Sequence, residues 1–451
     1  MVQFDEKNHG VSKARLASLF DAGTFVELGA YLKRSDSSDE LESVVCGYGS
    51  IGGALAFAFV QDSGRTKGAF GERHAKKIAS LYALAVKNGA PIIGVFDSAG
   101  AVVYDGVSAL SAYGTLMKNI SDASGIIPQI AVIDGVCGGA SCIAASMFDF
   151  VVTIKEKSEL FLNAPFTAGA LENAATSGLS AYEAESEAAA FGFVRELVAQ
   201  LPQNNADRVA LACADDLNRK IAFPKNGEID ALLSLLADGG RFTRLYRDYT
   251  ENTYFGFASF GGVLSGVIAS NPAKKGILDA KAAKAAAKLI SFCDAFSIPV
   301  LTLVDSEGLD SSADAYAASE FARLAMAYTS SECAKLTVVL GKAYGTAFTL
   351  LGSKSVGADM ALALPTACIS VLSPEASVAF VWNDRVGETS REALETEWRE
   401  TCASAASACD AGEIDDVIEP SELRQRICAA LGMLSAKAEG RPERKHTAMP
   451  L

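Results

Sequence analysis

The sequence has too few histidines, and cysteines too widely spaced, to predict a metal site. Its 451 residues include 3 histidines, far apart in the chain, and 10 cysteines that form no C-x-x-C pair. A structural zinc site needs four such ligands, usually in closely spaced pairs. We therefore expect no bound metal and no Ser-His-Asp triad, and we expect most cysteines to be reduced and buried as small apolar side chains.

Long apolar runs and an excess of positive charge are also missing. No apolar run reaches the roughly 18 to 20 residues that span a bilayer. The first residues, MVQFDEKNHG, lack the basic and then apolar plan of a signal peptide, so we expect a cytoplasmic protein. The formal net charge of −14 argues against a nucleic-acid partner, which needs a basic face.

Three familiar motifs of cofactor and nucleophile chemistry are absent as well, and a fourth does not stand where it would act. No G-x-G-x-x-G opens a predicted helix, and the chain has no G-x-x-x-x-G-K-[ST] phosphate loop, no G-x-S-x-G nucleophile elbow and no H-E-x-x-H zinc motif. The chemistry would therefore rest on backbone donors and on a reagent brought by another molecule.

What the chain does contain is a duplication. PIIGVFDSAG (91–100) and PVLTLVDSEG (299–308) share the pattern P-x5-D-S-x-G, and IAVIDGVCGG (130–139) and LTVVLGKAYG (336–345) each place two glycines four residues apart. Two further pairs keep the same order: Gly52-Gly53 with Gly261-Gly262, and SLFDAG (18–23) with SLLADG (234–239). A period of roughly 200 residues predicts two homologous domains, each able to bury its own core.

Helices and buried strands alternate in each half. HAKKIASLYALAVKNG (74–89) has apolar residues at helical spacing, and Gly89 should end that helix. PIIGVFD (91–97) is typical of a strand buried on both faces. AAKAAAKLISFCDAF (282–296) and PVLTLVD (299–305) repeat this order of helix and strand. The pattern predicts an α/β fold.

The turn-rich stretch 200–240 joins the halves, and we expect domains of 1–225 and 226–451. ENAATSGLSAYEAESEAAA (172–190) is acidic and rich in alanine, which predicts a helix that faces solvent. SELRQRICAALGMLSAKAEG (421–440) predicts a helix packed on one side.

Glycine-containing turns follow the buried strands. They are DSAGA (97–101) and VCGGAS (136–141) in the first half, and SEGLD (306–310) and KAYGTAF (342–348) in the second. Where such a turn enters a helix, backbone N–H groups lack an intrahelical acceptor and can hold an oxyanion. Alternatively, the small residues only allow strand and helix to pack closely. Because the whole set is repeated, we favour one anion pocket in each half.

Five long segments carry a resemblance to a known family: ASGIIPQIAVIDGVCGG (123–139), LISFCDAFSIPVLTLVD (289–305), GKAYGTAF (341–348), SKSVGADMALALPTACISVL (353–372) and IDDVIEPSELRQRICAAL (414–431). The chain resembles the carboxyltransferase subunits of biotin-dependent acyl-CoA carboxylases and decarboxylases, namely the propionyl-CoA carboxylase β-chain and methylmalonyl-CoA decarboxylase α-subunit family. This resemblance implies two tandem crotonase-like (ClpP/crotonase) domains, each a β-β-α superhelix.

The resemblance also implies a reaction. The chain would move a carboxyl group between carrier-bound biotin and the α-carbon of a short-chain acyl-CoA, a coenzyme A thioester. Acyl-CoA would bind the N-terminal domain and biotin the C-terminal domain of a facing subunit, which implies a homo-oligomer (a dimer or a trimer of dimers). Its partners would be a biotin carboxyl carrier protein and either a biotin carboxylase subunit or a membrane decarboxylase subunit. The biotin anion left by CO2 release would take the α-proton, so no protein base is required.

The family's site residues carry over position by position. The catalytic donors correspond to Gly139 and Ala140 for the acyl-CoA oxyanion, and to Thr346 and Ala347 for the biotin oxyanion. The flanking residues expected to bind substrate are Ala99, Gly100, Ala101, Gly138, Gly308, Gly345 and Thr349. Five basic residues either meet the CoA phosphates or form a solvated helix face: Arg65, Lys67, Arg73, Lys76 and Lys77.

Some positions depart from the family's pattern. SAGAV (98–102) stands where SGGAR is usual, so Val102 replaces an arginine, and SEGLD (306–310) replaces a PGF turn. Thr349 occupies a position that is linked to acyl-chain size in the family and is often aspartate. Three functions stay open: an acyl-CoA carboxylase component, the α-subunit of a sodium-pumping decarboxylase, or a catalytically degenerate crotonase-fold scaffold. The acyl group and the direction of transfer are open too.

Overall fold

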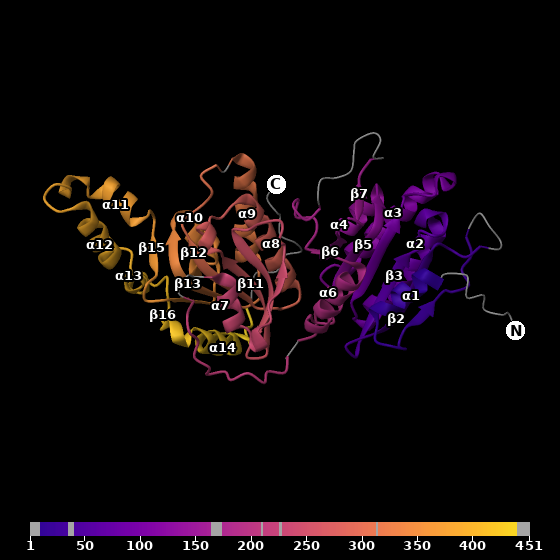
Figure 1. Ribbon diagram of the computed structural model, residues 1–451, viewed down its shortest axis with the longest axis horizontal. Helices are drawn as coiled ribbons and strands as arrows, with labels where there is room; N and C mark the ends of the chain where they lie inside the picture. Colours follow the sequence, from indigo (N-terminus) through magenta and orange to yellow (C-terminus); the bar gives the residue numbers. More distant parts are fainter. Residues whose placement is uncertain are drawn as a thin grey trace. The chain divides into compact units, whose positions relative to one another are not determined.

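The chain forms two compact units, Met1–Arg208 and Val209–Leu451 (Figure 1). The computed structural model describes residues 10–34, 40–163, 174–208, 211–224, 228–312 and 314–439. Within these ranges, no helix combines the length and the apolar character needed to cross a membrane.

The elements of the first unit follow in chain order: α1 (Gly10–Leu19), β1 (Val26–Leu28), β2 (Val44–Ile51), β3 (Ala54–Gln61), α2 (Glu72–Asn88), β4 (Ile92–Ser98), α3 (Val107–Ala123), β5 (Gln129–Gly138), α4 (Ala140–Ser146), β6 (Phe150–Ile154), β7 (Glu159–Phe161), β8 (Tyr182–Ala184) and α6 (Glu187–Gln200).

The elements of the second unit follow likewise: α7 (Ile229–Leu236), β9 (Thr243–Leu245), β10 (Thr253–Phe260), β11 (Val263–Ser270), α8 (Ala280–Ala295), β12 (Val300–Ser306), α9 (Ala315–Ser330), β13 (Lys335–Tyr344), α10 (Gly345–Leu350), β14 (Met360–Ala363), β15 (Cys368–Ser370), α11 (Pro374–Val381), α12 (Arg391–Thr401), α13 (Ala405–Asp410), β16 (Asp416–Val417) and α14 (Leu423–Leu434).

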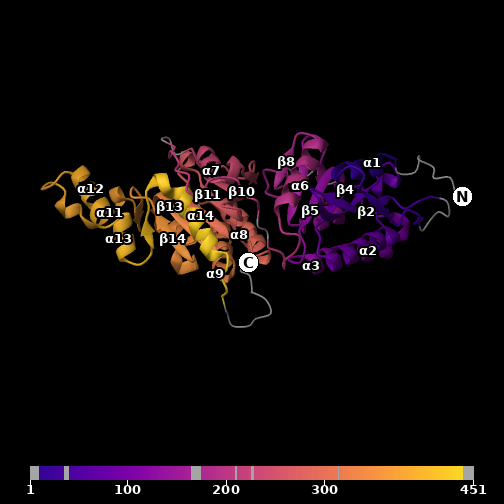
Figure 2. The same ribbon diagram turned by 90° about the horizontal axis from the view of Figure 1, so that it is seen from below.

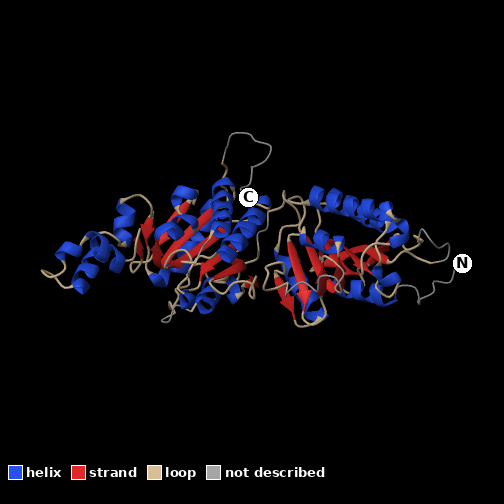
Figure 3. Ribbon diagram, turned by 90° about the horizontal axis from the view of Figure 1, so that it is seen from above, coloured by secondary structure: helices blue, strands red, loops and turns tan. Residues whose placement is uncertain are grey.

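The two units share one strand topology. The first sheet runs β1-β2-β3-β4-β5-β6-β8 with β7 beside β5, and the second runs β9-β10-β11-β12-β13-β14-β16 with β15 beside β13. The first three strands of each sheet pair antiparallel, and the later ones pair parallel. In the first unit, α2 and α3 lie on one face of the sheet and α1 and α6 on the other (Figure 2). Helices also flank the sheet of the second unit (Figure 3), so the duplicated α/β fold is confirmed.

Helix α2 shows why the sequence pattern succeeds. Its buried face includes Ile78, Leu81 and Tyr82, which lie at the predicted helical spacing. Gly89 ends the helix with φ +60° and ψ +48°, a left-handed conformation that favours glycine. Strand β4 follows with only Asp97 not fully buried, as expected for a central parallel strand.

One predicted element is wrong. The described part of 172–190 is not a solvent-facing helix: it forms a turn, strand β8 and only the first residues of α6. Ala181 and Ala184 are buried, so these alanines fill the core and do not promote a helix. Ser186 starts α6, because its hydroxyl oxygen accepts a hydrogen bond from the Ala189 N–H at 3.2 Å.

The aspartate of SLFDAG, Asp21, binds the glycine pair Gly52-Gly53 and an arginine, which gives both parts of this repeat a structural role. Asp21 accepts hydrogen bonds from the N–H groups of Gly52 (3.1 Å) and Gly53 (2.9 Å) at the β2–β3 hairpin. Arg195 donates to the same carboxylate at 2.7 Å and to the Leu19 carbonyl at 2.8 Å. The N–H donors, with Arg195, lower the pKa of Asp21 well below its ordinary range.

The second unit repeats this arrangement. Asp238 accepts from Gly261 (3.0 Å), Gly262 (2.8 Å) and Arg424 (2.7 Å). The side chain of Arg424, on α14, is fully buried, whereas that of Arg195 is 35% exposed. Helix α14 therefore packs on the second unit through an ion pair and through an apolar face. The apolar face confirms the prediction of a helix packed on one side.

Candidate functional site

The DSAGA turn forms a fixed wall at the end of β4. The Ala99 N–H donates to the Lys67 carbonyl at 3.0 Å, and the Gly100 N–H donates to the Ser98 hydroxyl oxygen at 3.2 Å. The Gly100 carbonyl accepts from the Phe70 N–H at 2.8 Å. Since these two N–H groups already have acceptors inside the fold, the turn can shape a pocket but has few donors to offer it.

The turn after β5 differs from the DSAGA turn because it leads directly into a helix, α4. Gly139 has φ +56° and ψ −124°, and its N–H donates to the Phe161 carbonyl at 2.8 Å. Gly138 lies against the Phe161 ring, where a Cβ would come within 2.6 Å of the ring carbon Cζ. Ala140 is the first residue of α4, a position whose N–H has no acceptor within the helix. Of the two predicted donors, Ala140 therefore has the N–H that can face a ligand, while Gly139 provides the backbone path.

The second unit repeats the first turn bond for bond. The Glu307 N–H donates to the Lys275 carbonyl at 2.9 Å, and the Gly308 N–H donates to the Ser306 hydroxyl oxygen at 3.3 Å. The Gly308 carbonyl accepts from the Leu278 N–H at 3.0 Å. The SAGAV and SEGLD turns therefore differ from each other in side chains but share the same backbone hydrogen bonds.

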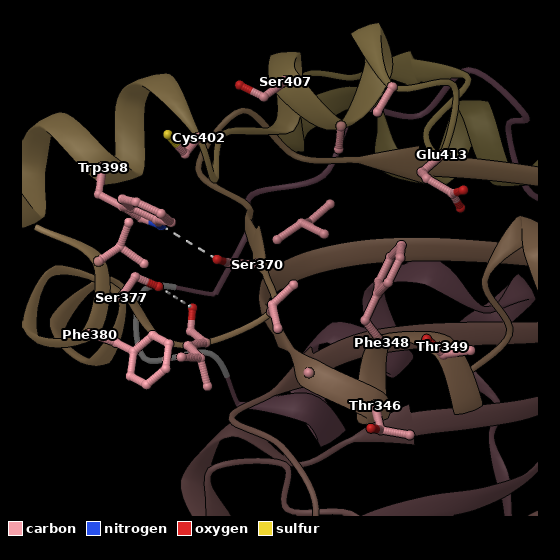
Figure 4. Close-up of a pocket in the computed structure, with 17 residues that line it drawn as sticks. Thr346, Phe348, Thr349, Ser370, Ser377, Phe380, Trp398, Cys402, Ser407 and Glu413 are labelled. Atoms are coloured by element: carbon pink, nitrogen blue, oxygen red, sulfur yellow. Dashed lines mark hydrogen bonds between the residues drawn. The ribbon is translucent and has the colours of Figure 1, made fainter.

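The second turn of this unit opens into a cavity of about 860 Å³. Gly345, with φ +59°, begins α10, and Gly345, Thr346 and Thr349 line the cavity, while the methyl group of Ala347 is buried. Strand β15, helices α11 to α13 and the loops next to them supply the rest of its walls (Figure 4). Side chains that define it are Thr346, Phe348, Thr349, Phe380, Trp398 and Glu413.

Aromatic packing and one carboxylate give this cavity its character. Trp398 donates from Nε1 to the Ser370 hydroxyl at 3.5 Å and packs edge to face on Trp382, with ring centroids 4.8 Å apart. Glu413 Oε2 is buried and has no hydrogen-bond partner within the described ranges. The cavity thus suits an apolar ring system that also carries an N–H donor.

A lysine and an acidic residue connect the two turns of the second unit, since Glu307 lies in the first turn and Lys342 in the second. Lys342 pairs with Glu307 at 2.7 Å, which raises the pKa of Lys342 and lowers that of Glu307. Burial raises the pKa of Asp305, which sits beside them at the end of β12. Across the described residues, no three His, Cys, Asp or Glu side chains are grouped to hold a metal ion.

Most of the basic candidates serve the fold. Lys77 is buried and donates to the Val44 carbonyl at 2.7 Å, so it is not free to meet a phosphate. Lys76 pairs with Glu72 at 2.6 Å, and Arg73 donates to two backbone carbonyls at residues 33–34. These contacts favour the solvated helix face for Arg73 and Lys76, whereas the buried Lys77 fits neither a phosphate contact nor a solvated face.

The structure groups the predicted residues by unit. Ala99, Gly100, Ala101, Gly138, Gly139 and Ala140 lie at the ends of neighbouring strands β4 and β5, and Gly308, Gly345, Thr346, Ala347 and Thr349 lie at the ends of β12 and β13. Sequence reasoning missed the walls built by Phe380 and Trp398, because those residues lie far along the chain from Thr346 and carry no repeat.

Known proteins resemble this chain over nearly its whole length. Residues 5–449 match the family described as "Carboxyl transferase domain". The methylmalonyl-CoA decarboxylase subunit alpha of Propionigenium modestum is 36% identical, over 99% of this chain and 95% of that protein. The propionyl-CoA carboxylase, carboxyltransferase subunit, of Haloferax mediterranei is 31% identical, over 99% and 94%.

Solved structures agree with these relatives. The crystal structure of transcarboxylase 12S, a hexamer with methylmalonyl-coenzyme A bound, matches with a TM-score of 0.91 and 28% identity, over 97% of this chain and 92% of that one. This match confirms the crotonase-like fold that the sequence predicts.

Proposed function

We propose, from the premise that the chain belongs to the carboxyl transferase domain family, that it transfers a carboxyl group between carrier-bound biotin and the α-carbon of a short-chain acyl-CoA. The observation that supports this is a matched pair of helix starts, one per unit: Gly139 with positive φ precedes Ala140 at the start of α4, and Gly345 with positive φ precedes Thr346 in the first turn of α10. Two turns suit a reaction in which two anions form, the thioester enolate and the biotin ureido oxygen.

We assign the acyl-CoA to residues 1–225. The thioester oxygen would accept the Ala140 N–H, and Ala99 to Ala101 with Gly138 would line the approach. Gly139 holds a conformation that a larger residue adopts only with strain, and this conformation sets the direction in which α4 and the Ala140 N–H begin. Such a donor typically contributes on the order of 3 kcal/mol to transition-state stabilisation.

We assign biotin to residues 226–451. The residues there fit a bicyclic ring: Ile369, Phe380 and Trp398 offer apolar walls, and the start of α10 offers the N–H groups of Thr346 and Ala347. When bound, the carrier's biotin supplies or accepts the carboxyl group. The chain's own part is to hold the ureido oxygen at Thr346 and Ala347, behind Gly345 and near Gly308, and Thr349 then helps to set which acyl chain is accepted.

A complete site would need a second copy of the chain. Each unit exposes apolar side chains close to its turns: Val103, Tyr104, Val107 and Leu110 in the first, and Val371, Phe380 and Val381 in the second. Clusters of this kind mark interaction surfaces. We propose that these surfaces meet between subunits of a cytoplasmic homo-oligomer, with acyl-CoA from one subunit facing biotin held by another.

The first candidate function is the carboxyltransferase component of an acyl-CoA carboxylase, which works with a biotin carboxyl carrier protein and a biotin carboxylase. A second candidate is the α-subunit of a decarboxylase that hands CO2 to a membrane partner. The 36% identity to the Propionigenium modestum decarboxylase subunit favours the second, and the backbone turns serve both directions equally. Co-purification of the native chain with a biotin carboxylase or with a multi-span membrane protein separates the two.

The reaction itself is tested without ATP. The purified chain is incubated with methylmalonyl-CoA and free biotin or a biotinylated carrier, and CoA-thioester decarboxylation is followed. Biotin-dependent loss of the carboxyl group supports the proposal. Absence of turnover with methylmalonyl-, malonyl- and glutaconyl-CoA, each with free biotin and with the biotinylated carrier, contradicts it and favours the scaffold alternative.

A further inference from the structure

A bulge interrupts the pairing of β4 with β5 just before the turn at Gly139. Phe96 pairs with Ile133, but the next pair along is Ser98 with Cys137. Three residues of β5, 134–136, therefore stand opposite the single residue Asp97. Bulges of this kind redirect a strand and are common beside active sites.

The Asp97 carboxylate fills this bulge. Its Oδ1 accepts a hydrogen bond from the Val136 N–H at 3.3 Å. It lies so close to Gly135 that a Cβ there would come within 2.6 Å of Asp97 Cγ, a distance that real Cβ atoms essentially never show. The Ser63 hydroxyl donates to the other oxygen at 2.5 Å, and Arg15 Nη1 lies 3.8 Å away. The carboxylate thus takes the place that a side chain at Gly135 would occupy.

The second unit contains the same device. Val304 pairs with Val339 and Ser306 with Ala343, so Asp305 alone faces residues 340–342. Its carboxylate accepts from the Lys342 N–H at 2.9 Å, and a Cβ at Gly341 would come within 2.7 Å of Asp305 Cγ. Asp97 and Asp305 share the contact with the facing glycine and the following N–H group, although other side chains surround them. The contact between aspartate and glycine is therefore the feature that the two units have in common.

Resting on the proposed function, we infer that Asp97 and Asp305 are positioning residues: each carboxylate sets the path of the next strand and so aims the following turn, Ala140 in one unit and Thr346 in the other, at its anion. The Asp-Gly pair accounts for the P-x5-D-S-x-G repeat and for the first glycine of each strand, Gly135 and Gly341. A residue that only packed the core would not need to be matched by a glycine across the bulge.

A double-mutant cycle tests the pairing. Gly135→Ala should lower kcat about tenfold or more, because the new methyl displaces the carboxylate and shifts the strand, while KM for acyl-CoA changes little. Asp97→Ala alone should also lower kcat about tenfold. In the double variant the methyl has room, so part of the activity lost in Gly135→Ala should return.

Matched controls use the other unit. Gly341→Ala with Asp305→Ala should show the same recovery, whereas the crossed pair Gly135→Ala with Asp305→Ala should show effects that simply multiply. Multiplicative effects within a unit, or an Asp97→Ala variant with wild-type kcat, would overturn the inference.

Amide hydrogen exchange gives a readout that does not depend on turnover. In Asp97→Ala, peptides from β5 should exchange faster while those from β13 stay as in the wild type, and Asp305→Ala should do the reverse. Failure of the wild type to turn over counts against the proposed function alone. Unchanged exchange in β5 of Asp97→Ala counts against the positioning role, whatever the activity.

Discussion

Gly139→Ala separates the chemistry of the first pocket from the stability of the fold. A Cβ at this position would meet only the Leu162 carbonyl oxygen, at 3.7 Å, which is an ordinary contact. The cost to the fold therefore comes from the backbone, which has φ +56° and ψ −124°. A residue other than glycine in such a region costs about 1 to 3 kcal/mol. We expect the melting temperature to fall by roughly 2 to 12 °C.

Activity should fall much further. The methyl group would stand beside the Ala140 N–H, where the thioester oxygen must approach, and loss of one oxyanion donor lowers kcat on the order of 100- to 1,000-fold. The assay is biotin-dependent decarboxylation of methylmalonyl-CoA, run well below the melting temperature of the variant. Folding is checked by circular dichroism and by thermal unfolding on the same samples.

Two control variants make the result interpretable. Gly106 has nearly the same conformation, with φ +53° and ψ −126° and no atom near its missing Cβ, so Gly106→Ala calibrates the cost of strain. Gly23 also has positive φ and open space, and Gly23→Ala should remain active. If Gly139→Ala turned over within about twofold of the wild type, the first pocket would be assigned to the wrong turn.

Three other variants or conditions test the remaining claims. Arg424→Ala should destabilise the fold by about 3 to 5 kcal/mol, because it removes a fully buried guanidinium that pairs with both Asp238 and Asp215. Arg195→Ala, at a 35% exposed side chain, should cost about 1 kcal/mol or less in urea unfolding; equal losses would contradict this. Although burial opposes charge on Asp238, backbone N–H donors and Arg424 lower its pKa, so its stabilisation is complete above its ordinary pKa and is lost as the pH falls through the folded value. The melting-temperature gap between wild type and Asp238→Asn should therefore narrow from pH 6 towards pH 3, and a widening gap would refute the sign. Tyr104→Glu and Phe380→Glu, at side chains 99% and 84% exposed, should reduce the oligomer to smaller species in light scattering, and an unchanged mass would place the interface elsewhere.

The sequence predicted what depends on local chemistry. Ile78, Leu81 and Tyr82 repeat at helical spacing, and Gly139 and Gly345 stand where positive φ is required, so helices and turns could be located without a structure. The duplication then predicted that both units share one topology. Each of these signals lies within a short segment or a repeat of it.

What escaped prediction depends on contacts between distant segments. Arg424 and Asp238 form an ion pair although 186 residues separate them in the sequence, and no local pattern marks that pair. The alanines of 172–190 looked like helix formers, but Ala184 is a buried strand residue. The sequence shows a glycine at 135 but not why a side chain is excluded there. The cause is the carboxylate of Asp97, which the register of β4 and β5 places against Gly135.

The most direct measurement is a crystal structure of the chain with a non-hydrolysable acyl-CoA analogue and biotin bound together. The account predicts the thioester oxygen about 2.7 to 3.1 Å from the Ala140 nitrogen, and the biotin ureido oxygen at the same distance from the Thr346 or Ala347 nitrogen of a facing subunit. A complex with both oxygens held in one unit, or with either turned away from these nitrogens, would contradict the claim that each unit stabilises one of the two anions.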